Sequence, residues 1–150
     1  MLYLCGMNLM TFIFGTPNLR VNTLTIRLDM STIKKIVWMS LKWCNINMSR
    51  DGHNKPPCKI SIMKQTHGEP CYGQYDGVTN TIIIFYNQCY NVKMLIRTVL
   101  HEYTHYLQPV ESTYHKLLEE HGYDKHPQEV EARKIEKYYL NVWNKIKFEI

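Results

Sequence analysis

The segment from Asn91 to Gln108 constrains the fold most strongly, because its apolar residues repeat with the period of an α-helix. At about 100° per residue, His101 and His105 fall on one side of this helix, together with Met94 and Thr98. Nearly opposite lie seven apolar or aromatic side chains: Val92, Leu95, Ile96, Val99, Tyr103, Tyr106 and Leu107. One face therefore packs into a core, and the other presents two imidazoles to a cleft.

The histidine face carries an H-E-x-x-H motif, His101-Glu102-Tyr103-Thr104-His105. Residues four apart on a helix point the same way, so both imidazoles can bind one metal ion. Zinc suits this arrangement, since two imidazoles at about 2.0–2.1 Å leave room for a third protein ligand and a water. Glu102 would take a proton from that water. The alternative is a chance match on an ordinary amphipathic helix, and the two opposed faces argue against it.

Length and composition predict one globular domain over residues 1–150, with 45% hydrophobic and 21% charged residues. The five scattered cysteines form no C-x-x-C pair, which favours free thiols in a reducing, cytoplasmic compartment. The apolar start lacks a preceding basic residue and is shorter than the roughly 20 residues of a membrane span. Residues 1–18 are therefore expected to be a buried strand or a poorly ordered extra segment, and no membrane partner is expected.

The net charge of +5 is concentrated before residue 91, where nine Lys or Arg face four Asp or Glu. A basic surface can attract nucleic acid. The lysines are dispersed, however, which favours an ordinary solvated face. Nucleic acid is thus the less favoured partner, and a peptide or protein substrate the favoured one.

Elsewhere the pattern alternates between short β-branched runs and helical periodicity. Asp29 or Ser31 is expected to cap the first helix, and Asp76-Gly77 to form a hairpin turn. The run at 79–86 is either a central strand or an open edge for an extended substrate. We expect an α+β domain with strands at 19–28, 59–64 and 79–86, and helices at 32–45, 91–108, 111–120 and 127–147.

A third metal ligand is expected after His105. The periodicity of the last helix distinguishes two glutamates: Glu131 falls inside its apolar stripe, and Glu129 falls about 160° away, facing water. A buried carboxylate is costly unless it is paired or bound to a metal. This selects Glu131, with a buried ion pair to a lysine or arginine as the alternative. The other candidates are His115, Glu119, Glu120, His121, Asp124 and His126.

The motif, followed 26 residues after His105 by Glu131-Ala132, resembles the gluzincin class of zinc metallopeptidases. The small size is similar to minigluzincins and to small phage metallopeptidases. The resemblance covers residues 79–147 and implies a small zincin-like domain that hydrolyses peptide bonds. It also implies Zn²⁺ held by His101, His105 and Glu131, with Glu102 as the catalytic base.

The resemblance has departures. Gln108 and Glu111 replace the glycine and the third histidine of the metzincin template, which excludes that class. Some gluzincins carry an aspartate four residues after the ligand glutamate; Ile135 stands there, so the resemblance assigns no residue to support His101. Tyr138 shares the face of Glu131 and is the candidate catalytic donor, with Tyr123 and His126 as alternatives.

Two other functions are compatible with the same motif. One is a DNA-associated protein with a structural metal site, whose basic first part makes the functional contact. The other is a regulatory peptidase directed at one protein partner.

Overall fold

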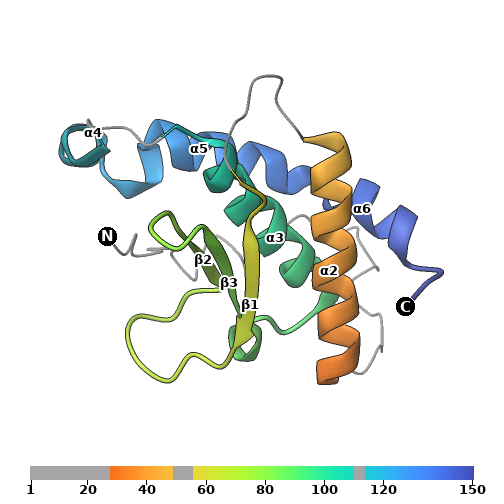
Figure 1. The fold of residues 1–150 in the computed structure, drawn as a ribbon. Coiled ribbons are helices and arrows are strands. Elements are labelled where there is room, and N and C mark those ends of the chain that lie inside the picture. Colours follow the sequence, from red (N-terminus) through yellow and green to blue (C-terminus); the bar gives the residue numbers. More distant parts are fainter. Residues whose placement is uncertain (1–27, 49–55, 110–113) are drawn as a thin grey trace, which may run out of the picture.

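The computed structural model describes residues 28–48, 56–109 and 114–150. The expectations for residues 1–18, and for nearly all of the strand at 19–28, lie outside these ranges. The described elements form a small α+β domain, as expected (Figure 1). The α-helices are α2 (Met30–Asn47), α3 (Val92–Leu107), α4 (Tyr114–His121), α5 (Pro127–Ile135) and α6 (Tyr139–Ile146), and the strands are β1 (Lys59–Met63), β2 (Gly73–Asp76) and β3 (Thr81–Phe85). Three 3-10 segments complete them: η2 (Tyr86–Gln88), η3 (Tyr123–Lys125) and η4 (Glu136–Tyr138).

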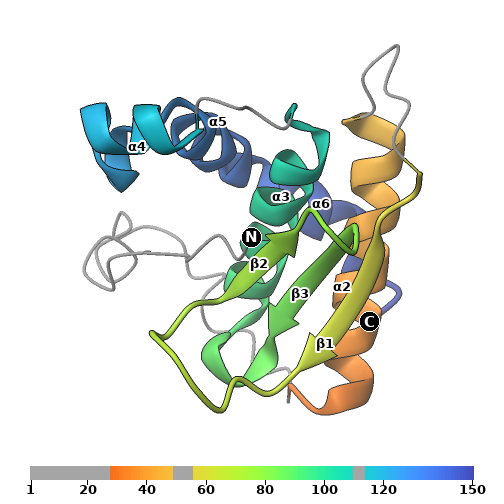
Figure 2. The ribbon, with the colours of Figure 1, turned by 60° about the vertical axis from the view of Figure 1, so that its left-hand side comes forward.

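The three described strands form one mixed sheet in the order β1-β3-β2 (Figure 2). β1 runs parallel to β3, and β2 antiparallel to it. The β-branched run at 79–86 is therefore the middle strand of this sheet, which decides against the open-edge alternative. β2 was not expected, because its four residues lie in a stretch rich in turn formers. The expected turn at Asp76-Gly77 does join β2 to β3.

A side-chain cap begins each of the two helices of the core. Asp29 accepts a hydrogen bond from Thr32 N at 2.8 Å, which confirms the first of the two expected caps of α2. Asn91 accepts one from Met94 N at 2.9 Å at the start of α3. Each cap satisfies a backbone donor that has no partner inside its own helix.

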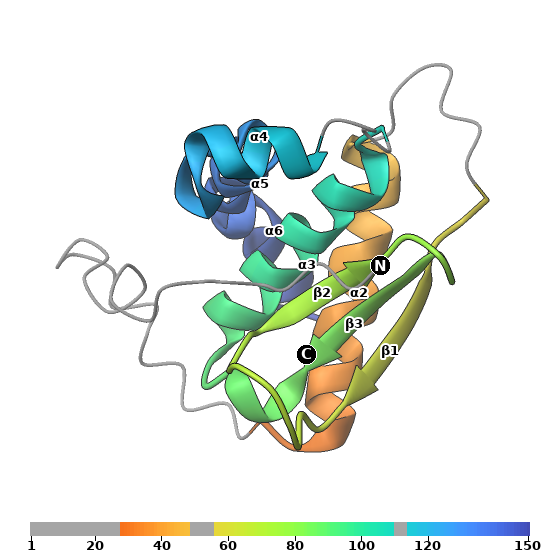
Figure 3. The ribbon, with the colours of Figure 1, turned by 90° about the vertical axis from the view of Figure 1, so that its left-hand side faces the viewer.

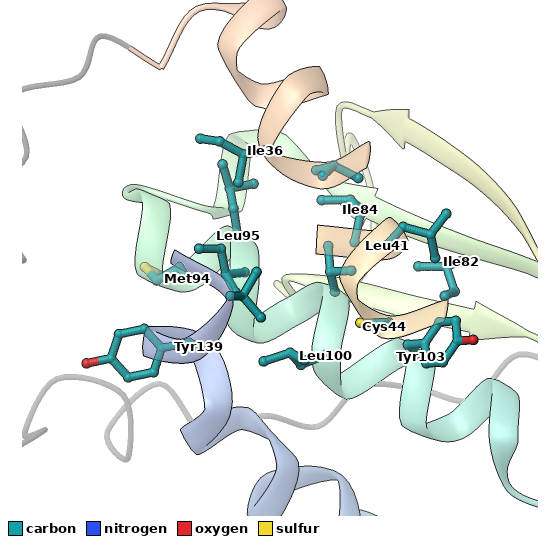
Figure 4. Close-up of a cluster of buried hydrophobic side chains, with 14 of the residues drawn as sticks. Ile36, Leu41, Cys44, Ile82, Ile84, Met94, Leu95, Leu100, Tyr103 and Tyr139 are labelled. Carbon is teal, nitrogen blue, oxygen red and sulfur yellow. The ribbon is translucent and has the colours of Figure 1, made fainter. Parts of the chain in front are cut away.

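Helix α3 lies between the sheet and the C-terminal helices and also packs against α2 (Figure 3). All seven residues of its predicted apolar face are buried. They meet side chains of α2 and β3, including Ile36, Leu41, Ile82 and Ile84, in one hydrophobic core (Figure 4). The opposite face is not the open cleft that we expected, because α5 covers it and His101 is only 2% exposed.

The region expected as one helix from 127 to 147 is divided in the structure. α5 and α6 are separated by η4, a single 3-10 turn. The buried residues of α6 are apolar or aromatic: Tyr139, Val142, Trp143 and Ile146. Those of α5 and η4 are Glu129, Ala132 and Glu136, which share one face. Among the described residues, no helix has both the length and the apolar character needed to cross a bilayer.

Gly73 brings β2 unusually close to α3. A Cβ atom at this position would lie 2.7 Å from Thr98 Cγ2, 2.8 Å from the backbone oxygen of Ile83 and 3.2 Å from Glu102 Cγ. The backbone oxygen belongs to the middle strand and cannot move without disturbing the sheet. β2 can therefore approach α3 this closely only because residue 73 has no side chain.

We predict that Gly73→Ala lowers the free energy of unfolding by about 1–3 kcal/mol, the usual cost of forcing extra volume into a packed site. Urea denaturation measures it. Gly77→Ala is the matched control, because a Cβ there meets only Tyr75 Cε1 at 3.7 Å, and its stability should stay the same or rise slightly. Equal stabilities for the two variants would contradict this account of β2.

Candidate metal centre

Two imidazoles from α3 and one carboxylate from α5 meet in the interior. The ring nitrogens His101 Nε2 and His105 Nε2 are 3.1 Å apart. The carboxylate of Glu129 straddles them, with Oε2 3.3 Å from His101 Nε2 and Oε1 3.2 Å from His105 Nε2. Among the His, Cys, Asp and Glu residues of the described ranges, these three form a group whose ligand atoms all lie within 4.8 Å of one another.

The outer nitrogen of His101 is held by an acid. His101 Nδ1 lies 2.8 Å from Glu136 Oε1. Arg97 donates from Nε and Nη2 to the other oxygen, Glu136 Oε2, at 2.9 and 2.5 Å. A carboxylate that takes both Arg97 hydrogen bonds at Oε2 accepts at Oε1 as well, so Nδ1 carries a proton of His101. Its Nε2 lone pair is then directed at Glu129 and His105.

The outer nitrogen of His105 is held by an amide. Gln108, the C-cap of α3, places Oε1 2.7 Å from His105 Nδ1. An amide oxygen only accepts, so His105 Nδ1 also carries a proton and its Nε2 lone pair is directed inward. The chain therefore aims two imidazole lone pairs and a carboxylate at one place. Three acceptors converging in this way require a cation or a proton between them.

The three residues lie close enough together to share one metal ion. Two ligand atoms about 2.0–2.1 Å from zinc at a tetrahedral angle are about 3.3–3.4 Å apart, and each histidine Nε2 lies 3.1–3.3 Å from the other Nε2 and from one oxygen of Glu129. Glu129 Oε2 is also buried without a hydrogen-bond partner among the described residues, although it lies 3.3 Å from His101 Nε2. The donor set and the unsatisfied oxygen both fit a bound divalent cation.

Without a metal ion, the positive charge that these acceptors require is supplied by a proton. Burial lowers the pKa of His101, but the carboxylates of Glu129 and Glu136 outweigh it and raise this pKa to about 10. Burial raises the pKa of Glu129, but hydrogen bonding and charge attraction from the two histidines outweigh it and hold this pKa well below its usual range. The site thus stabilises positive charge beside an ionised carboxylate.

Glu102 lies on a different side of α3 from the two histidines. It is 3% exposed, and its Cγ packs beside Gly73 of β2. Burial raises the pKa of its carboxyl group, while the neighbouring histidines act in the opposite direction. Glu102 is thus held between α3 and the sheet, next to the histidines and without joining their cluster.

Glu129, and not Glu131, lies beside the two histidines. The prediction that Glu131 is buried and Glu129 faces water is wrong. Glu129 is 4% exposed, whereas Glu131 is partly exposed. The Glu131 carboxylate is not part of the histidine cluster and accepts a hydrogen bond from Gln108 Nε2 at 2.9 Å. Gln108 is therefore one partner of this carboxylate.

The prediction was wrong because it treated residues 127–147 as one straight helix, although η4 changes the helical phase between α5 and α6. A 3-10 turn advances about 120° per residue instead of about 100°, so three residues shift the phase by about 60°. The apolar stripe was set mainly by α6, and it does not continue along α5. A better signal was present: Glu129, Ala132 and Glu136 are spaced by three and four residues and so share one face.

Glu136 was missed altogether. Ile135 occupies the position at which some gluzincins have an aspartate that supports the first histidine. Glu136, at the next position and seven residues after Glu129, contacts His101 Nδ1 instead. Tyr138, the expected catalytic donor, is 47% exposed and has no hydrogen bond to the cluster in the described part of the chain. His126 is fully buried, and its Nδ1 accepts from Gln128 N at 3.2 Å, so it caps α5.

Comparison of the chain with protein-family models, with curated proteins and with solved structures found no match.

Removal of the Glu136 charge should destabilise the protein even without metal. We expect Glu136→Gln to lower the free energy of unfolding by about 1–3 kcal/mol in EDTA. A fully buried pair would lose about 3–5 kcal/mol, but the Arg97 side chain is 25% exposed, so solvent screens part of the effect. Urea denaturation of Glu136→Gln and of Glu119→Gln, an exposed glutamate, makes the comparison. Identical midpoints would refute a structural role for the Arg97–Glu136 pair.

Proposed function

We propose that the protein is a zinc-dependent metallopeptidase whose metal ligands are His101, His105 and Glu129. The observation that supports this most is the convergence of two inward imidazole lone pairs and a buried carboxylate from separate helices. A proton shared among these groups would also satisfy them at these separations, and the zinc titration below distinguishes the two. The metal ligand that the gluzincin resemblance placed at Glu131 is here proposed to be Glu129.

The residues of the chain divide the chemistry between them. A zinc ion bound at this site would polarise a peptide carbonyl and lower the pKa of a water molecule. Glu102 accepts the proton of the attacking water and passes it to the leaving amine nitrogen. Glu136 and Gln108 keep the imidazoles in the tautomer that directs Nε2 inward. Gly73 leaves room for the Glu102 side chain beside β2.

Zinc binding is the first test. We expect the purified protein to hold about one zinc per chain and Glu129→Gln to weaken zinc binding by at least about tenfold, or roughly 1.4 kcal/mol. Glu131→Gln, which keeps an acceptor for Gln108, should remain within about threefold of the parent protein. Competition titration with a zinc chelator compares the two variants. Tighter binding by Glu129→Gln than by Glu131→Gln would return the ligand role to Glu131.

Catalysis is the second test, because zinc binding alone does not make a peptidase. Glu102→Gln should keep the metal and lose peptide hydrolysis by at least about a hundredfold, since a positioned general base contributes about 10²–10⁴. Hydrolysis of an unfolded protein such as casein is the assay, with zinc content measured on the same samples. Undiminished turnover by Glu102→Gln would eliminate Glu102 as the base. Tyr138→Phe should retain full activity, because Tyr138 is exposed.

A further inference from the structure

Gln108 occupies a position where every polar atom of its side chain has a partner. The residue is 3% exposed and caps the end of α3. Its Oε1 is 2.7 Å from His105 Nδ1. Its Nε2 donates to Gln128 O at 3.0 Å and to Glu131 Oε2 at 2.9 Å. Both amide hydrogens are thus used by acceptors on α5, which fixes which end of the amide faces His105.

The direction of this amide decides the tautomer of His105. With the oxygen toward the ring, Nδ1 must donate, and the Nε2 lone pair is available to a metal. With the amide reversed, its nitrogen would face Nδ1, which would then have to accept, and the proton would move to Nε2. That tautomer cannot bind a metal through Nε2. Reversal would also turn the amide oxygen toward two other acceptors, Gln128 O and the Glu131 carboxylate.

We propose that Glu131 and Gln108 form a positioning relay for the metal site: Glu131 orients the Gln108 amide, and the amide fixes the tautomer and ring angle of His105. This inference rests on the proposed function. It gives Glu131 a role in metal binding that is not ligation. The same two residues tie the end of α3 to the first turn of α5, where Glu129 projects toward the histidines.

The relay predicts a specific order of zinc affinities. Gln108→Leu removes both functions of the amide and should weaken zinc binding by about 10–100-fold, as loss of a partner of a metal-bound histidine commonly does. Glu131→Ala, which removes the acceptor, should weaken it by about 3–10-fold. Glu131→Gln keeps an acceptor and should restore nearly the parent affinity. Glu119→Gln, at an exposed position outside the site, is the control and should change nothing.

Non-additivity separates a relay from two independent contributions to folding. If Glu131 acts through Gln108, the double variant Gln108→Leu, Glu131→Ala should bind zinc no more weakly than Gln108→Leu alone. The visible spectrum of bound Co²⁺ reports the ligand geometry directly, and it should change in Gln108→Leu and be restored in Glu131→Gln. If Gln108→Leu fails to fold, Gln108→Glu replaces it, because a carboxylate still accepts from His105 Nδ1 but repels Glu131. Affinity should then be low, and Glu131→Gln in the same chain should recover it.

The outcomes distinguish the relay from the metal site itself. Absence of zinc binding by the parent protein would overturn both the proposed function and the relay. If the parent binds zinc in a manner that depends on Glu129, but Gln108→Leu and Glu131→Ala bind it equally well, the relay alone is overturned. Additive losses in the double variant would also overturn it, since Glu131 would then act without Gln108.

Discussion

The contact between the acidic face of α5 and the histidine face of α3 is the interaction on which the rest of the structure depends. His101, Glu129 and Glu136 are each at most 4% exposed. Burying ionisable groups costs several kcal/mol unless each is paired. Arg97 and Gln108 satisfy the outer atoms of this cluster, and its inner atoms face one another at 3.1–3.3 Å. The two helices therefore pack here because their charges are matched, not because the surfaces are apolar.

The remaining elements hold α3 in position for this contact. α2 and the sheet bury its apolar face, so the helix is fixed on one side by ordinary hydrophobic packing. The histidines and Glu102 project on different sides of the same helix: His101 and His105 toward α5, and Glu102 toward Gly73 of β2. This division puts the histidine cluster and the buried carboxyl group of Glu102 on different sides of α3, within about one turn of each other.

The helices and strands that were predicted correctly are those whose residues show a clear pattern along the chain. α2, α3, β1 and β3 were found from periodicity and β-branched runs, and Asp29 from its capping chemistry. β2 was not predicted, because its own residues favour turns and it forms a strand only by pairing with β3. The place of Glu129 in the cluster was not predicted for a related reason. Its burial is set by the histidines on α3, whereas the apolar stripe used to judge it belongs to α6.

The polar contacts also specify how α5 lies on α3. Arg97, His101 and His105 succeed one another at intervals of four residues, so they form a single row along α3. Their partners come in the reverse order along the chain: Arg97 meets Glu136, His101 meets both Glu136 and Glu129, and His105 meets Glu129. Gln108 continues the series at Gln128 O.

This reverse order of contacts arises only when the two helices run antiparallel in one register. Ala132 is the one apolar side chain at the fully buried positions of α5, and Ile135 packs against the core only at the end of the helix, so apolar packing contributes less than the polar contacts to that register. The paired charges select it, and the same pairs that place α5 also bring Glu129 to the two imidazoles.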